Sequence, residues 1–102
     1  MAATVDIGTL ITSRPEIHGG RPCLAGTGMT VLAIVGLYKQ GIPAEEILRD
    51  HFDHLDLARI YAALAYWAAN REEIDGYFRE DAEAEAEWIA EIEARESQAA
   101  TA

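Results

Sequence analysis

A glycine-rich stretch between residues 19 and 30 constrains this chain more than any other feature. It reads GGRPCLAGTGMT and holds four of the eight glycines in the sequence. Glycine reaches positive φ at little cost, whereas proline fixes its own φ and biases the residue before it toward extended backbone. We therefore predict a tight hairpin over residues 9–29 that feeds a helix, although a plain structural turn is an alternative. The loop motif consists of Gly20, Arg21, Pro22, Gly26 and Thr27.

These glycines do not form a phosphate-binding loop. A P-loop has four residues between its glycines and then Lys followed by Ser or Thr, whereas five residues separate Gly20 from Gly26 and no lysine follows. The dinucleotide pattern is missing too, because no third glycine follows Gly28 at the required spacing. We expect no nucleotide and no other cofactor.

Composition and charge indicate one small domain with an acidic extension. The chain has 102 residues, half of them apolar, which is enough for a core. A single cysteine, Cys23, excludes an intramolecular disulfide, and no apolar run approaches membrane-spanning length, so we expect a cytoplasmic protein. The net charge of −10 is uneven: eleven acidic and three basic residues lie from Arg71 onward, against seven and five before it.

Four helical runs follow the glycine-rich loop. Thr30 and Asp56 are good N-caps, Gly41 is placed to end the first helix, and Pro43 is placed to begin the second. The pattern predicts helices near 31–40, 43–50, 57–70 and 72–78. The predicted fold is mainly α: a helix-turn-helix-like three-helix domain with a short N-terminal β-hairpin over residues 1–78, and a long acidic helical tail over residues 79–102.

The tail combines acidic residues with one returning apolar cluster. Alanine and glutamate alternate from Asp81 to Glu87, after which Trp88, Ile89 and Ile92 resume an apolar stripe. An acidic helix with an aromatic and aliphatic cluster is typical of a segment that binds a groove on another protein. Folding back on its own domain is the alternative. The candidate partner-binding residues are Ile74, Tyr77, Phe78, Trp88, Ile89 and Ile92.

No catalytic or metal-binding constellation emerges from the sequence. The densest set of ligand-type residues spans 50–56, but His51 and His54 lie three residues apart in an expected loop, so we interpret it as a polar connector. Cys23 has no recognisable base beside it, and the carboxylates of a solvated tail lack the burial that would separate two pKa values. We expect no catalytic residue, no metal and no enzymatic activity.

The order of motifs from Gly19 to Tyr66 resembles the bacterial family called domain of unknown function 433. The resemblance rests on the Gly20-Arg21-Pro22 and Gly26-Thr27 motifs, the run from Gly41 to Leu48, the His54-Leu55-Asp56 motif with Ile60, and the run from Ala62 to Tyr66. It implies a helix-turn-helix-like domain that acts as the antitoxin of a PIN-like ribonuclease toxin. The chain departs from the family pattern at Gly28, where the family has arginine, and at Phe52-Asp53, where it has Tyr-Pro.

The resulting hypothesis is a type II antitoxin that binds its PIN-like toxin through the tail and represses its own operon as a homodimer on operator DNA. Phosphate binding requires basic side chains, and few are present in the body of the chain. The DNA-binding candidates are Arg14, Arg21, Lys39, Arg49 and Arg59, with residues 43–50 or 57–70 as the recognition helix. The alternative is a stand-alone DNA-binding regulator or a dimeric protein-interaction module.

Overall fold

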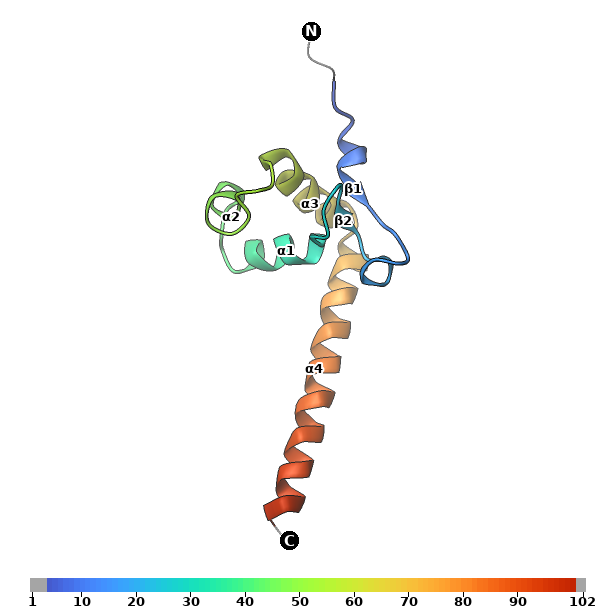
Figure 1. Cartoon of the computed structure of the whole chain (residues 1–102), viewed down its shortest axis with the longest axis vertical. Coiled ribbons are helices and arrows are strands. Elements are labelled where there is room, and N and C mark those ends of the chain that lie inside the picture. The colour runs from blue at the N-terminus through green and yellow to red at the C-terminus, as the bar shows by residue number, and fades with distance from the viewer. Residues whose placement is uncertain (1–3, 101–102) are drawn as a thin grey trace. The chain divides into compact units, whose positions relative to one another are not determined.

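The computed structural model describes residues 4–100 and is mainly helical, with one short antiparallel sheet near the N-terminus (Figure 1). This arrangement confirms the predicted fold class. The strands are β1 (Ile11–Thr12) and β2 (Cys23–Leu24), and the helices are α1 (Val31–Lys39), α2 (Ala44–Asp50), α3 (Leu57–Ala69) and α4 (Arg71–Ala100). The chain divides into two compact units, and the division falls between Arg71 and Glu72.

The predicted hairpin is present, but its strands are short. Ile11 pairs with Leu24 and Thr12 with Cys23. The predicted start of the hairpin at residue 9 is wrong, because Ile7–Leu10 form a 3-10 helix and β1 begins at Ile11. Asp6 caps this helix: its side chain accepts a hydrogen bond from the Gly8 amide at 3.0 Å, and its carbonyl accepts one from the Thr9 amide at 2.9 Å. The hydrogen bond of the Asp6 side chain therefore favours a helical turn at residues where strand pairing was expected.

Positive φ angles shape the backbone on both sides of β2. A second 3-10 helix, His18–Gly20, precedes β2, and Gly20 and Gly26 have φ of 87° and 77°. These are left-handed values that favour glycine. The hairpin is then joined to α1 by a hydrogen bond of 2.9 Å from the Val31 amide to the carbonyl of the buried Pro22.

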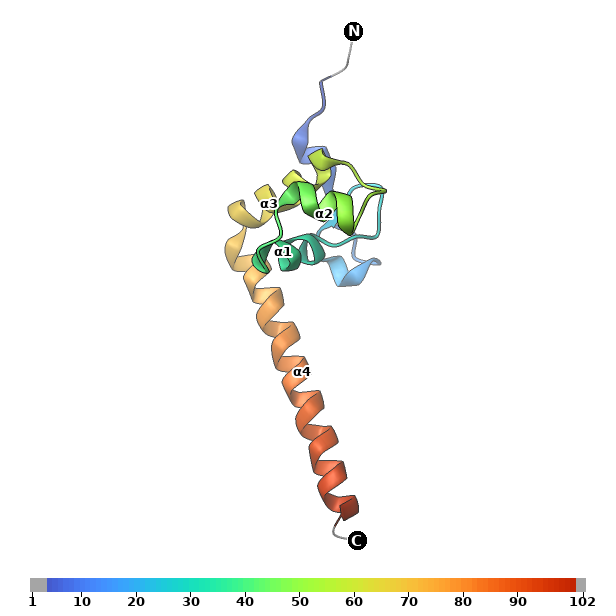
Figure 2. The same cartoon turned by 90° about the vertical axis from the view of Figure 1, so that its left-hand side faces the viewer.

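N-cap side chains and a turn glycine set the boundaries of the helices α1 to α3. The Thr30 hydroxyl accepts from the Ala33 amide at 3.2 Å, and the Asp56 carboxylate accepts from the Arg59 amide at 2.7 Å, so both predicted N-caps are confirmed. Gly41 adopts a φ of 93° in the turn between α1 and α2. α3 packs against both α1 and α2 (Figure 2).

The core consists of aliphatic side chains from the hairpin and the helices. Leu24, Ile34 and Ile60 are fully buried, so the strands and two helices meet at one centre. The buried apolar residues of the first unit are Leu10, Cys23, Leu24, Val31, Leu32, Ile34, Val35, Ala44, Ile47, Ile60, Ala62 and Ala63.

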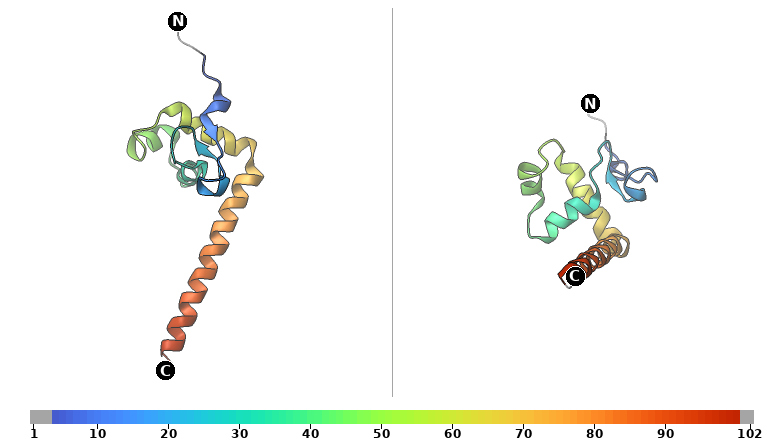
Figure 3. Two further views of the ribbon diagram at one scale, coloured as in Figure 1. Left: turned by 45° about the vertical axis from the view of Figure 1, so that its right-hand side comes forward. Right: turned by 60° about the horizontal axis from the view of Figure 1, so that its bottom comes forward.

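α4 is one continuous helix of 30 residues, without a break where the predicted tail begins (Figure 3). Its first turn contains Glu72 and Glu73, where acidic side chains interact favourably with the helix dipole. All residues from Arg79 to Glu91 are exposed. Among residues 4–100, no helix is both long and apolar enough to cross a membrane.

Candidate functional site

The glycine-rich loop is held by its own hydrogen bonds. The Thr27 hydroxyl donates to the Leu24 carbonyl at 2.8 Å and accepts from the Met29 amide at 3.1 Å. The Ala25 amide donates to the Leu10 carbonyl at 2.8 Å, which ties the loop to the N-terminal segment. The hydroxyl of Thr27 therefore stabilises the conformation of the glycine-rich loop.

Arg59, one of the DNA-binding candidates, joins this loop to α3. Its Nε donates to the Ala25 carbonyl at 3.0 Å across 34 positions of sequence, and its guanidinium also pairs with Asp56 at the start of the helix. The side chain is only 30% exposed. Two of the five N–H donors of its guanidinium are thus engaged within the fold.

A cavity of about 340 Å³ lies beside the loop, where Gly28 replaces the family arginine. A Cβ at Gly28 would meet no atom within 4 Å, so the side chain of alanine fits at this position without displacing a neighbour. Nε2 of His18 lies 3.0 Å from the Gly28 carbonyl oxygen. The lining residues are Thr12, Arg14, Ile17, Cys23, Gly26, Thr27 and Gly28.

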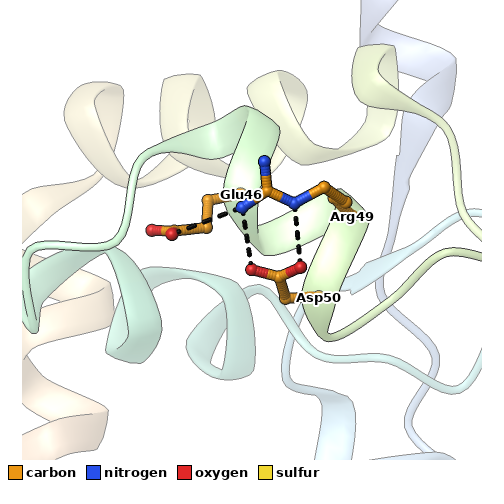
Figure 4. Close-up of polar contacts among 3 residues, drawn as sticks. All are labelled: Glu46, Arg49 and Asp50. Carbon is orange, nitrogen blue, oxygen red and sulfur yellow. Dashed lines mark hydrogen bonds and ion pairs between the residues drawn. The ribbon is translucent and has the colours of Figure 1, made fainter.

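α2, one of the two candidate recognition helices, has an acidic surface. Arg49 donates to both carboxylate oxygens of Asp50 at 2.9 and 3.0 Å and also pairs with Glu46 at 3.4 Å (Figure 4). These contacts raise the pKa of Arg49 and lower that of Asp50. Because Glu45 adds a further negative charge in the first turn, α2 presents a surface that repels phosphate.

The other candidate cations lie elsewhere on the first unit. Lys39, at the end of α1, has its Nζ 5.5 Å from the centre of the Trp67 ring, and the Arg71 guanidinium lies 4.1 Å from the same ring. Arg14 is exposed beside the cavity, and Arg21 is half-buried.

The cysteine and the metal-type ligands that the sequence analysis considered are not arranged as a reactive site in the described part of the chain. Cys23 is buried, and this burial raises the pKa of its thiol, which keeps the thiol protonated at neutral pH. Its Sγ lies 3.5 Å from the Arg21 carbonyl oxygen. Within the described part of the chain, no three His, Cys, Asp or Glu side chains are placed to hold a metal ion.

The six partner-binding candidates on α4 differ in exposure. Ile74 is fully buried, while Tyr77 and Phe78 are half-buried. Trp88 is 63% exposed, Ile89 is 43% exposed and Ile92 is half-buried. We call Trp88, Ile89 and Ile92 the α4 anchor, because these residues form the apolar cluster on the exposed part of α4.

Two contacts that the sequence analysis did not predict connect the helices. The Tyr61 hydroxyl on α3 donates to the Glu45 carboxylate on α2 at 2.6 Å, which lowers the pKa of Glu45. On α1, Tyr38 packs edge-to-face on Trp67 with 6.1 Å between ring centres. Both contacts join residues distant in sequence, so no spacing motif indicates them.

Comparison with known proteins identifies the family. No curated protein matches the chain. Among solved structures, a DUF433 member from Anabaena variabilis ATCC 29413 is 29% identical to it; the match covers 68% of this chain and 67% of that one, with a TM-score of 0.61. The family model described as protein of unknown function (DUF433) matches residues 11–67, which is more than half of the sequence. The chain therefore belongs to the family called domain of unknown function 433.

Proposed function

We propose that this protein is a non-catalytic antitoxin that binds and inhibits a PIN-like ribonuclease through α4. The exposed α4 anchor carries the proposal. Trp88 and Ile89 are 63% and 43% exposed on a helix that otherwise consists largely of charged residues and alanine. Clustered exposed apolar side chains are characteristic of interaction surfaces, and tryptophan is a frequent energetic centre of interfaces.

Charge favours a basic partner. From Arg71 onward the chain has eleven acidic and three basic residues, and a ribonuclease needs basic surface to hold its polyanionic substrate. The family resemblance, which implies pairing with PIN-like toxins, points to the same class of partner.

Operator binding receives less support from the contacts in the first unit. Arg49 and Arg59 each pair with carboxylates of their own helical segments, which weakens their attraction for phosphate. Autoregulation as a dimer on DNA, and the alternatives of a stand-alone regulator or a dimeric interaction module, remain separate hypotheses.

Co-purification tests the proposal. The full chain, carrying an affinity tag, is expressed together with the product of the adjacent gene, which the proposal expects to be a PIN-like ribonuclease, and the pair is passed over a size-exclusion column. We expect one co-eluting complex with the full chain and none with a chain that ends at Ala82. Separate elution of the full chain and the ribonuclease would contradict the proposal.

A further inference from the structure

The cavity beside the glycine-rich loop has one cationic side chain and apolar walls. Its lining comes from two segments, residues 12–17 and residues 23–28. Within the described part of the chain, Arg14 alone among the lining residues carries a charge, and none of them is acidic. Ile17 and the buried Cys23 supply apolar surface. The cavity therefore suits a molecule that combines one negative charge with an apolar group.

The polar side chains at the cavity are available to a ligand. Arg14 is exposed, and its guanidinium makes no hydrogen bond or ion pair with residues 4–100. The hydroxyl of Thr12 is likewise without a hydrogen-bond partner among these residues. A guanidinium presents its N–H donors in a planar fork that binds both oxygens of a carboxylate. Arg14 is thus the free counterpart of Arg49, which already donates to both carboxylate oxygens of Asp50.

The backbone around the cavity is held by hydrogen bonds. The Arg14 carbonyl accepts from the Ile17 amide at 3.0 Å, which closes a turn. Nε2 of His18 lies 3.0 Å from the Gly28 carbonyl oxygen and so joins the two ends of the lining. His18 has a φ of 50°, a left-handed value that is costly for a residue other than glycine and persists only where the surrounding structure holds it. The walls are thus preorganised, which lowers the entropic cost of binding a small molecule.

Charge and size narrow the class of ligand. The whole chain has a net charge of −10, so it repels a multivalent anion such as a nucleotide, whereas one free guanidinium is enough to neutralise one carboxylate. A volume of about 340 Å³ lies at the small end of the range for small-molecule sites. A carboxylic acid with a short aliphatic or aryl group meets both conditions.

We propose that this cavity binds a small monocarboxylate that carries an apolar group. The carboxylate pairs with the Arg14 guanidinium and accepts a hydrogen bond from the Thr12 hydroxyl, and the apolar group packs on Ile17 and Cys23. The site lies in the first unit of the chain and does not rest on the function proposed for α4.

An NMR titration of the isotope-labelled full chain tests the site. The probe is hexanoate, and hexanamide is its uncharged counterpart of nearly the same shape. We expect hexanoate to shift the backbone amide signals of Gly26, Thr27 and Gly28 with a Kd of about 1 mM or tighter, and hexanamide to bind about tenfold more weakly or less. Equal binding of the two probes, or hexanoate shifts that do not saturate by about 10 mM, would overturn the proposal.

Two arginine substitutions separate the cavity from the general charge of the surface. Arg14→Gln removes the free guanidinium, whereas Arg49→Gln makes the same change in net charge on α2. Both side chains are exposed, so the urea midpoint of each variant should stay close to that of the unmodified protein. We expect Arg14→Gln to weaken hexanoate binding about tenfold and Arg49→Gln to change it less than about twofold. Equal effects of the two variants would overturn the proposal.

Discussion

At the scale of single residues, two arginines that each lie on a helix, Arg49 and Arg59, make different kinds of contact. Arg49 is paired on the surface with its neighbours Glu46 and Asp50, whereas Arg59 reaches back to the Ala25 carbonyl in the glycine-rich loop. In the sequence both stand near acidic residues, and both were predicted as DNA-binding candidates. Their difference arises from the packing of the loop against α3, which local spacing does not encode.

Arg59→Ala is expected to destabilise the protein by about 1.5–3 kcal/mol, because it leaves the Ala25 carbonyl without its charged donor and removes the Asp56 pair. Urea unfolding followed by circular dichroism measures the change. Arg49→Ala is the matched control. Its urea midpoint should equal that of the unmodified protein, since exposed ion pairs add little stability. Equal losses in the two variants would contradict the role given to Arg59.

The hydrogen bond between Tyr61 and Glu45 predicts a dependence of stability on pH. The bond lowers the pKa of Glu45 below its ordinary value of 4.5 and raises that of Tyr61 above 10.0. The stabilisation is therefore present between these values, is lost as the pH falls below 4.5 and Glu45 protonates, and is lost again as it rises above 10.0 and Tyr61 ionises.

The variant Tyr61→Phe removes the donor and keeps the ring. The difference in urea midpoint between the unmodified protein and this variant should be largest near pH 7 and should shrink at pH 3. A constant difference from pH 3 to pH 7 would show that the hydroxyl of Tyr61 affects stability by something other than its hydrogen bond to the ionised Glu45.

At the scale of elements, capping and turn chemistry made the helices predictable. Thr30 and Asp56 cap α1 and α3 as expected, and Asn70 ends α3, where its backbone N–H donates to the Tyr66 carbonyl at 2.8 Å. The 3-10 helix at Ile7–Leu10 was missed because a single Asp6 side chain decides it against a β-prone sequence. Short elements depend on one or two bonds, so pattern predicts them poorly.

Gly41→Ala is expected to cost about 1–2 kcal/mol of stability, because position 41 has a φ of 93° in the turn between α1 and α2. Gly28→Ala serves as its control, since Gly28 lies outside the left-handed region and has open space around it. We expect the control to change the free energy of unfolding by less than about 0.5 kcal/mol. A similar cost at both positions would contradict the turn geometry.

Trp88→Ala should leave the helix content of the protein unchanged and weaken ribonuclease binding by about 2 kcal/mol or more, because Trp88 is 63% exposed and forms the centre of the α4 anchor. Isothermal titration calorimetry with the PIN-like ribonuclease measures the loss. Ile7→Ala is the control, since Ile7 is 66% exposed but lies outside α4. An unchanged affinity for Trp88→Ala would place the binding energy elsewhere.

At the scale of the whole molecule, the apolar core and the negative charge are concentrated in different parts of the sequence. The apolar residues that are buried in the described structure lie between Leu10 and Ile74, whereas most of the negative charge follows Arg71. Composition alone predicted this asymmetry. The acidic surface of α2 and the engagement of Arg59 could not be predicted, because each depends on which side chains meet after folding.

The central claim is that α4 inhibits the ribonuclease, and RNA cleavage tests it most directly. The product of the adjacent gene, which the proposal expects to be a PIN-like ribonuclease, is titrated with the full chain and with a chain that ends at Ala82, whose retained fold is checked by its urea midpoint. Because the buried apolar residues end at Ile74, this midpoint should not change. We predict complete inhibition by the full chain at equimolar ratio and none by the shortened chain; equal inhibition by both would contradict the account.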